Sequence, residues 1–152
     1  MASSQISNAY FLQHGGALKM LLAQDRQTEL DRLYRYACQK AEAGDTAAAC
    51  RLFMLLTVYD GWSFDYWFQL ARCCQAEHLW LDAAWAYGRA ARIRPDEPDI
   101  PCLASECYAS AGCTSLASRA ARAALRLCGT LPKWQSVRRR AGILLNKTGE
   151  AR

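Results

Sequence analysis

The sequence predicts an all-α protein. Its 152 residues include 27 alanines but only 12 Val, Ile and Thr residues together, and only 13 Gly and Pro residues. Alanine favours helices most strongly, whereas β-branched residues favour strands. No apolar run approaches the roughly 18 residues that a membrane-spanning helix needs, so we expect no direct membrane insertion. The first ten residues have neither a basic nor an apolar region, so we expect no cleaved signal peptide.

The chain repeats itself with a period of 34 residues. Shifted by this period, Ala49 aligns with Ala83 and Ala117, and Ala37 aligns with Ala71. This period and pattern are typical of the tetratricopeptide repeat, a helix-turn-helix unit with small residues where its two helices cross. The middle copy is the most complete, and its signature positions are Trp67, Leu70, Ala71, Ala83, Tyr87, Ala90 and Pro95.

We therefore expect a tetratricopeptide-repeat superhelix of three helix-turn-helix repeats, at about 30–63, 64–97 and 98–131. Each repeat leaves an apolar face that the next repeat covers. Pro98 and Pro101 place the start of the helix in the third repeat at about residues 99–101, because proline is tolerated only in the first turn of a helix.

Helical segments are expected to flank the repeats on both sides. Residues 5–22 are apolar for a free tail, which predicts packing on the array or on a second subunit. Residues 133–147 carry apolar side chains at helical spacing, which predicts a helix that covers the last repeat. The predicted division is an N-terminal helical segment over 1–29 as the candidate site of homodimer formation, the repeats over 30–131, and a capping helix with a basic tail over 132–152.

The sequence predicts no catalytic residue, metal site or cofactor. Its eight cysteines include no C-x-x-C pair, so reduced thiols are expected and zinc is a weak alternative. His14 and His78 have no motif around them that would make a base or a ligand. Phosphate-binding loops, nucleophile elbows and H-E-x-x-H pairs are absent from the sequence. A binding protein is expected rather than an enzyme.

The charge is divided between the two ends of the chain. Residues 1–114 carry a net charge of −3, and residues 115–152 carry +8. Arg119, Arg122 and Arg126 share one helix face, as a phosphate-binding stripe would require. No base-reading element accompanies them, so a solvated helix face is expected and nucleic-acid binding is the weakest alternative.

The concave face, lined by the first helix of each repeat, is the predicted binding surface. Residues one turn apart on these helices give an aromatic and small apolar floor with acidic and amide edges, which suits an extended peptide. For Tyr34 and Phe68, plain packing against the neighbouring helix is the alternative. The predicted residues are Asp31, Tyr34, Cys38 and Ala41 in the first repeat, Asp65, Phe68, Arg72 and Gln75 in the second, and Cys102 and Glu106 in the third, with Asp99 and Ala109 on the same face.

Several separated segments resemble one family. They are LYRYACQKAEAGDTAAACRLFMLLTVYD, FDYWFQLARCCQA, AAWAYGRAARIRPDEP and ASECYASAG. Over about residues 17–129 the chain resembles the class II chaperones of bacterial type III secretion, the SycD/LcrH family. The segment HGGALKMLL near the start resembles the SscA-like branch of that family.

The resemblance implies a chaperone of the bacterial cytoplasm. Members of this family hold the N-terminal segment of a hydrophobic translocator protein in the concave groove and keep the translocator soluble and secretion-competent. They also form dimers through N-terminal helical segments. Tyr34 and Phe68 fall at pocket-forming positions, whereas Cys38 and Ala41 stand where family members often have larger aromatic residues. The alternative is a generic tetratricopeptide-repeat scaffold, or a secretion-linked regulator that binds another protein.

Overall fold

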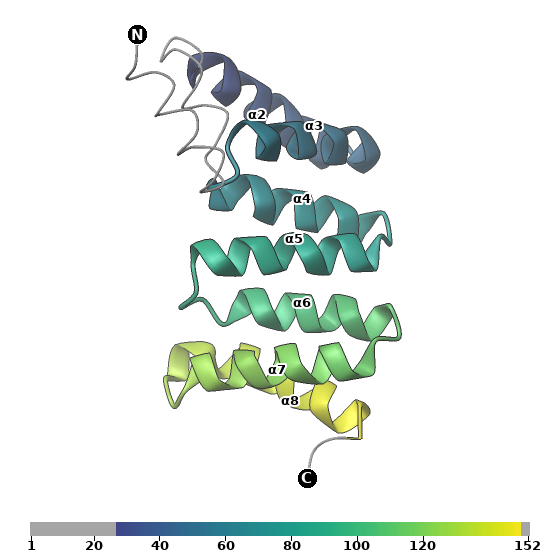
Figure 1. Cartoon of the computed structure of the whole chain (residues 1–152), viewed down its shortest axis with the longest axis vertical. Coiled ribbons are helices and arrows are strands. Elements are labelled where there is room, and N and C mark those ends of the chain that lie inside the picture. Colours follow the sequence, from purple (N-terminus) through teal and green to yellow (C-terminus); the bar gives the residue numbers. More distant parts are fainter. Residues whose placement is uncertain (1–26, 150–152) are drawn as a thin grey trace, which may run out of the picture.

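The computed structural model describes residues 27–149 and, within that range, consists of helices with no strand. The helices stack along one axis (Figure 1), which confirms the all-α repeat fold. They are α2 (Gln27–Glu42), α3 (Thr46–Tyr59), α4 (Phe64–Ala76), α5 (Trp80–Ile93), α6 (Asp99–Ser110), α7 (Thr114–Cys128) and α8 (Gln135–Lys147), with a short 3₁₀ helix, η3 (Pro132–Trp134), before α8. Between residues 27 and 149, no helix combines the length and the hydrophobicity that a membrane span requires.

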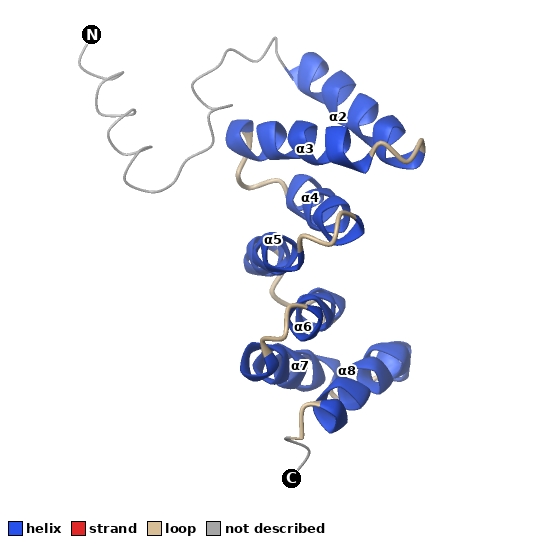
Figure 2. Ribbon diagram, turned by 90° about the vertical axis from the view of Figure 1, so that its right-hand side faces the viewer, coloured by secondary structure: helices blue, strands red, loops and turns tan. Residues whose placement is uncertain are grey.

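Three helix pairs make up the array. The pairs α4/α5 and α6/α7 fall within the second and third predicted repeats, and α6 begins at Asp99, inside the expected range. The pair α2/α3 spans the first predicted repeat but begins three residues before it. Figure 2 shows α4, α6 and α8 on one side of the stack and α5 and α7 on the other. Residues 27–29, which the prediction assigned to the N-terminal segment, form the first turn of α2. The predicted packing of residues 5–22 lies outside the described residues.

A left-handed residue links the two helices of each repeat. Gly44, His78 and Gly112 have φ angles of 85°, 60° and 75°, and they stand one period apart. Glycine adopts this conformation at low cost at the end of a helix, whereas a residue with a Cβ is strained there. In the first repeat, Asp45 then caps α3 by accepting a hydrogen bond from the backbone N–H of Ala48 at 3.3 Å.

Small residues lie where the helices cross, as the repeat pattern predicts. Ala37, Ala49, Ala71 and Ala83 are fully buried, and Phe53 fills the space beside the first crossing. Because alanine adds little bulk, the paired helices can approach closely. Six cysteines serve the same purpose as small buried residues: Cys50, Cys73, Cys74, Cys102, Cys107 and Cys128.

Candidate peptide-binding groove

Two hollows lie along the side of the stack formed by the first helices of the repeats. The first hollow, between α2 and α4, has a volume of about 340 Å³, and the second, between α4 and α6, about 450 Å³. The first hollow is lined by Cys38, Ala41, Glu42, Thr46, Gln69, Arg72, Cys73 and Ala76. The second hollow is lined by Phe68, Arg72, Gln75, Ala76, Trp80, Tyr87 and Leu103.

Five of the predicted residues meet at these hollows. Cys38 and Ala41 line the first hollow, and Phe68 and Gln75 line the second. Arg72 lines both, so its exposed side chain stands between two separate spaces. Because Cys38 and Ala41 are small, they leave room between α2 and α4 that larger side chains would fill.

The two predicted aromatic residues differ in their surroundings. Tyr34 lines neither hollow; it packs against Phe53 and Tyr66, with ring centroids 5.9 and 5.5 Å apart, and burial raises the pKa of its hydroxyl. Phe68 stacks on Phe64 at 5.5 Å but also lines the second hollow. Packing within the array therefore accounts for Tyr34, whereas Phe68 contributes to both the packing and the groove.

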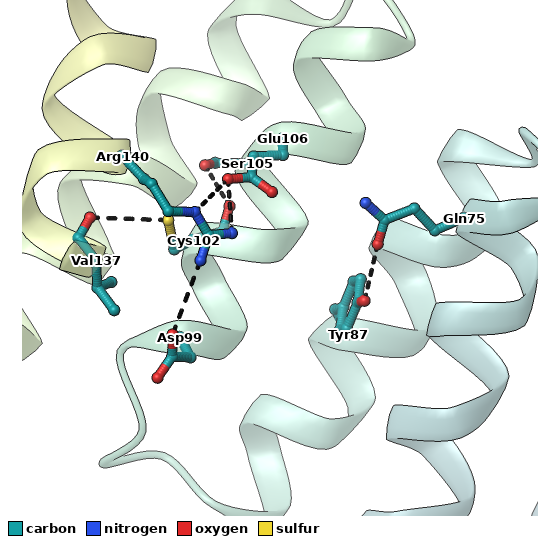
Figure 3. Close-up of polar contacts among 8 residues, drawn as sticks. All are labelled: Gln75, Tyr87, Asp99, Cys102, Ser105, Glu106, Val137 and Arg140. Atoms are coloured by element: carbon teal, nitrogen blue, oxygen red, sulfur yellow. Dashed lines mark hydrogen bonds and ion pairs between the residues drawn. The ribbon is translucent and has the colours of Figure 1, made fainter.

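A hydrogen bond orients Gln75 beside the second hollow. The buried hydroxyl of Tyr87 donates to Oε1 of Gln75 at 2.9 Å (Figure 3). Burial also raises the pKa of this tyrosine well above its ordinary value, so the hydroxyl stays a donor at physiological pH. With its oxygen held by Tyr87, Gln75 can offer its amide N–H groups to a ligand.

Helix α8 covers the predicted face of the third repeat. The prediction that Cys102 faces the groove is wrong, because its side chain is fully buried and its Sγ lies 3.9 Å from the carbonyl oxygen of Val137 in α8. Arg140 of α8 pairs with Glu106 at 2.6 Å and with Asp99 at 3.9 Å (Figure 3). The two acidic residues therefore contact the capping helix, and the open hollows lie at the first two repeats and the edge of α6.

The remaining predicted residues lie away from the hollows. Asp31 and Asp65 are exposed near the N-terminal ends of α2 and α4 and line neither hollow. An acidic side chain in the first turn stabilises a helix through its dipole, which accounts for Asp65 without a ligand. Ala109 also lines neither hollow.

Known structures resemble this fold closely. No family model matches the sequence, and no curated protein matches it. A chain of a type III secretion complex from Aeromonas hydrophila is 29% identical, with a TM-score of 0.78 over 94% of this chain and 95% of that chain. PcrH from Pseudomonas aeruginosa is 26% identical, with a TM-score of 0.68 over 84% of this chain and 95% of that chain. The secretion chaperone SycD from Yersinia enterocolitica was solved with a peptide of the translocator YopD. It is 24% identical, with a TM-score of 0.73 over 84% of this chain and 97% of that chain.

The chain is similar to the SycD/LcrH family of type III secretion chaperones. The resemblance seen in the sequence is thereby confirmed at the level of the family. Assignment to the SscA-like branch stays a prediction. The shared fold spans nearly the whole length of the Aeromonas hydrophila and Yersinia enterocolitica chains, so the family likeness concerns the complete repeat array.

Part of the lining of the groove was not predicted from the sequence. Gln69, Cys73 and Ala76 each follow a predicted residue by one position and line the first hollow. The surface that a helix turns toward a groove is wider than a single row of side chains. Including the adjacent row of side chains would therefore have predicted these three residues from the sequence. Leu103 of α6 and Trp80 of α5 complete the second hollow, and only the packing of three helices brings them together.

Proposed function

We propose that this chain is a non-enzymatic chaperone of the bacterial cytoplasm that binds a hydrophobic translocator protein through its concave groove and keeps it soluble and secretion-competent. One observation carries the proposal: two hollows lie side by side in the groove and share Arg72 and Ala76. Such an arrangement suits an extended segment whose spaced apolar side chains enter separate pockets. In related structures, SycD is bound to a peptide of YopD, and PcrH to the chaperone-binding regions of PopD and PopB, which supports the same class of partner here.

The residues of the groove divide the work of binding between apolar burial and backbone contacts. A large apolar side chain that leaves water for one of the hollows contributes about 1.5–3 kcal/mol before the cost of ordering the peptide. Arg72 and the half-buried Gln69 and Gln75 supply N–H donors at the edges for backbone carbonyls of the client. The affinity is therefore spread over several modest contacts, and a membrane-inserting segment is masked without any chemical step.

The client is the N-terminal segment of a translocator, and its path ends near α6. Leu103 lines the second hollow, whereas Cys102 and Glu106 lie under α8. Of the predicted peptide-binding set, Cys38, Ala41, Phe68, Arg72 and Gln75 are retained here as contacts of the client, and Tyr34 as the support of the wall beside them.

The groove is tested by filling it rather than by removing its walls. Loss of Tyr34 would disturb the core through Phe53, so a failure to bind would be ambiguous. Ala76 is exposed and lines both hollows, and Ser110 is exposed at the same repeat position, away from either hollow. The Ala76→Trp variant is co-expressed with each translocator of its secretion system. We expect at least about fivefold less soluble translocator than with the wild-type chaperone, because the new indole obstructs both hollows. Ser110→Trp is the matched control and should recover wild-type amounts.

Circular dichroism and thermal melting establish that both variants are folded. A folded Ala76→Trp protein that copurifies with as much translocator as the wild type would overturn the groove assignment. Equal translocator solubility with and without the chaperone would overturn the function itself.

Self-association is a separate part of the proposal. Residues 1–29 are the candidate dimerisation segment, and SycD of Yersinia enterocolitica has been solved as an alternative dimer, which supports this class of assembly. Sedimentation of the full chain should show a concentration-dependent dimer, and removal of residues 1–26 should shift it to monomer. A dimer of unchanged strength after the removal would contradict the assignment to this segment.

A further inference from the structure

The outer side of α7 carries a third hollow that the groove does not use. Its volume is about 520 Å³, larger than either hollow of the groove. In Figure 2, α7 lies on the side of the stack opposite α6 and α8. The hollow is lined by Tyr108, Leu116, Arg119, Ala120, Arg122, Ala123 and Arg126.

The side chains of this surface form two adjacent rows along α7. Leu116, Ala120, Ala123 and Leu127 recur at helical spacing and make an apolar row, in which the two leucines are 39% and 40% exposed. Arginines 119, 122 and 126 make a basic row beside it, about 10 Å long at 1.5 Å per residue. We call these two rows, with Tyr108 at their edge, the α7 surface.

Two of the three arginines of the basic row have no ion-pair partner among the described residues. The sequence has no Asp or Glu from residue 107 to residue 149. Among the residues that the structure describes, Arg119 and Arg126 form no ion pair, whereas Arg140 on α8 is paired with Glu106 and Asp99. A positive potential therefore extends over α7 and is free to attract a negatively charged partner.

We propose that the α7 surface is a second protein-docking site, independent of the groove, for an amphipathic helix of a partner protein that carries acidic residues in one row and apolar residues in the next. The acidic row faces the arginines, and the apolar row meets Leu116 and Leu127. Ala120 and Ala123 lie between these leucines, and their small side chains let a second helix approach closely.

The apolar row favours a protein partner over a nucleic acid. A phosphate backbone would be bound by the arginines alone and would gain nothing from two exposed leucines. Exposed leucines beside Arg119 and Arg126 are the arrangement of a protein interface, in which apolar area supplies affinity and charge supplies orientation. A chaperone with such a site could hold its client in the groove while a separate protein binds α7.

The proposal is tested with a synthetic helical peptide of about 18 residues, which spans five turns. It carries glutamates in one row and leucines in the adjacent row, and a matched peptide carries glutamines in place of the glutamates. Fluorescence anisotropy should give at least about tenfold tighter binding of the acidic peptide at low salt, and this preference should shrink as salt is added. In ¹⁵N-labelled protein, the acidic peptide should shift the amide resonances of α7 and leave those of the first and second hollows unchanged.

The repeat supplies a closely matched control. Arg51 and Arg92 are exposed and occupy the same repeat positions as Arg119 and Arg126, one or two periods earlier. The double variant Arg119→Glu, Arg126→Glu should bind the acidic peptide at least about tenfold more weakly than the wild type does. The double variant Arg51→Glu, Arg92→Glu should bind it with an affinity within about twofold of the wild-type value. Neither pair should alter the recovery of the translocator in the groove.

The apolar row is tested separately by replacing Leu116 and Leu127 with alanine. Loss of the two leucine side chains should lower the affinity for the acidic peptide by at least about threefold, because less apolar area is buried on binding. The proposal is overturned if the acidic peptide does not bind, if the glutamine peptide binds equally well, or if the two charge-reversed pairs behave alike. Tighter binding of a single-stranded oligonucleotide, insensitive to the leucine changes, would show a nucleic-acid surface instead.

Discussion

Arg140 and Glu106 pair at 2.6 Å and stand 34 positions apart in the sequence. One period separates them, so α8 docks on α6 as the first helix of a fourth repeat would. The guanidinium also lies 3.9 Å from Asp99, which ties both acidic residues of α6 to the last helix. This contact decides where the open groove ends.

Breaking the pair should loosen the C-terminal end of the array. Because both side chains are partly exposed, we expect Arg140→Ala to lower the free energy of unfolding by only about 0.5–1 kcal/mol. Urea denaturation of Arg140→Ala, Glu106→Ala and the double variant would measure the coupling. Arg139→Ala, at an exposed neighbouring position, is the control and should be near neutral. Equal losses for Arg139→Ala and Arg140→Ala would contradict a specific contact.

His78 strains the turn of the second repeat. Within residues 27–149 it is the one non-glycine residue with a positive φ, at a position where the other two repeats have glycine. His78→Gly should raise the free energy of unfolding by about 1 kcal/mol, because a left-handed residue with a Cβ carries a cost of that order. The substitution also removes the edge-to-face contact between the rings of His78 and Trp80, whose centroids lie 5.0 Å apart. The expected gain in stability of about 1 kcal/mol is therefore an upper limit.

The reverse change provides the check on that prediction. The φ of Gly112 is 75°, and a Cβ added there would meet no atom within 4 Å, so any cost of Gly112→His comes from the backbone. We expect Gly112→His to lower stability by about 1 kcal/mol. A stabilising Gly112→His would refute the strain argument.

The cysteines should fall into two classes of reactivity. Cys38 and Cys113 are half-buried, whereas the other six are buried. Burial raises the pKa of Cys73, Cys102 and Cys107 to about 11, so few of these thiols are ionised at pH 8. A thiol reagent should therefore label two cysteines quickly, and Cys38→Ser with Cys113→Ser should remove this fast phase.

The same reagent reports on the groove. Cys38 lines the first hollow, and Cys113 does not. A bound translocator peptide should slow the labelling of Cys38 several-fold and leave Cys113 unchanged. Protection of both residues, or of neither, would argue against peptide contact at the first hollow.

Asp45 should make stability depend on pH in the acid range. The ion pair with Lys40 at 3.2 Å and the hydrogen bond from Ala48 N–H hold the pKa of its carboxyl below the ordinary value of 3.8. A lowered pKa in the folded state stabilises the fold above the ordinary value, and that contribution is lost as pH falls through the lowered pKa. Wild type should thus be more stable than Asp45→Asn at pH 6, and the difference in melting temperature should shrink as the pH falls below 3.8 and through the lowered pKa of the folded state. A difference that is independent of pH would show that the carboxylate charge has no role.

Most of the fold could be predicted from the 34-residue period. Alanines at helix crossings, glycines at the turns and the proline before α6 act through neighbouring residues, so the sequence locates the helices and their pairing directly. Arg72 and Gln75 of the predicted groove face line the hollows, because their helix, α4, has a neighbouring first helix on each side; their contact with a peptide stays a prediction.

The sequence by itself thus determined an all-helical repeat array, its 34-residue period and the start of the first helix of the third repeat. Only the tertiary structure decided that Cys102 is buried, that Tyr34 packs on Phe53, and that Glu106 meets Arg140. The physical reason is that the same repeat position has a different neighbour in each repeat. Where the next helix leaves space, the side chain lines a hollow; where α8 closes on α6, the equivalent side chain becomes part of the core.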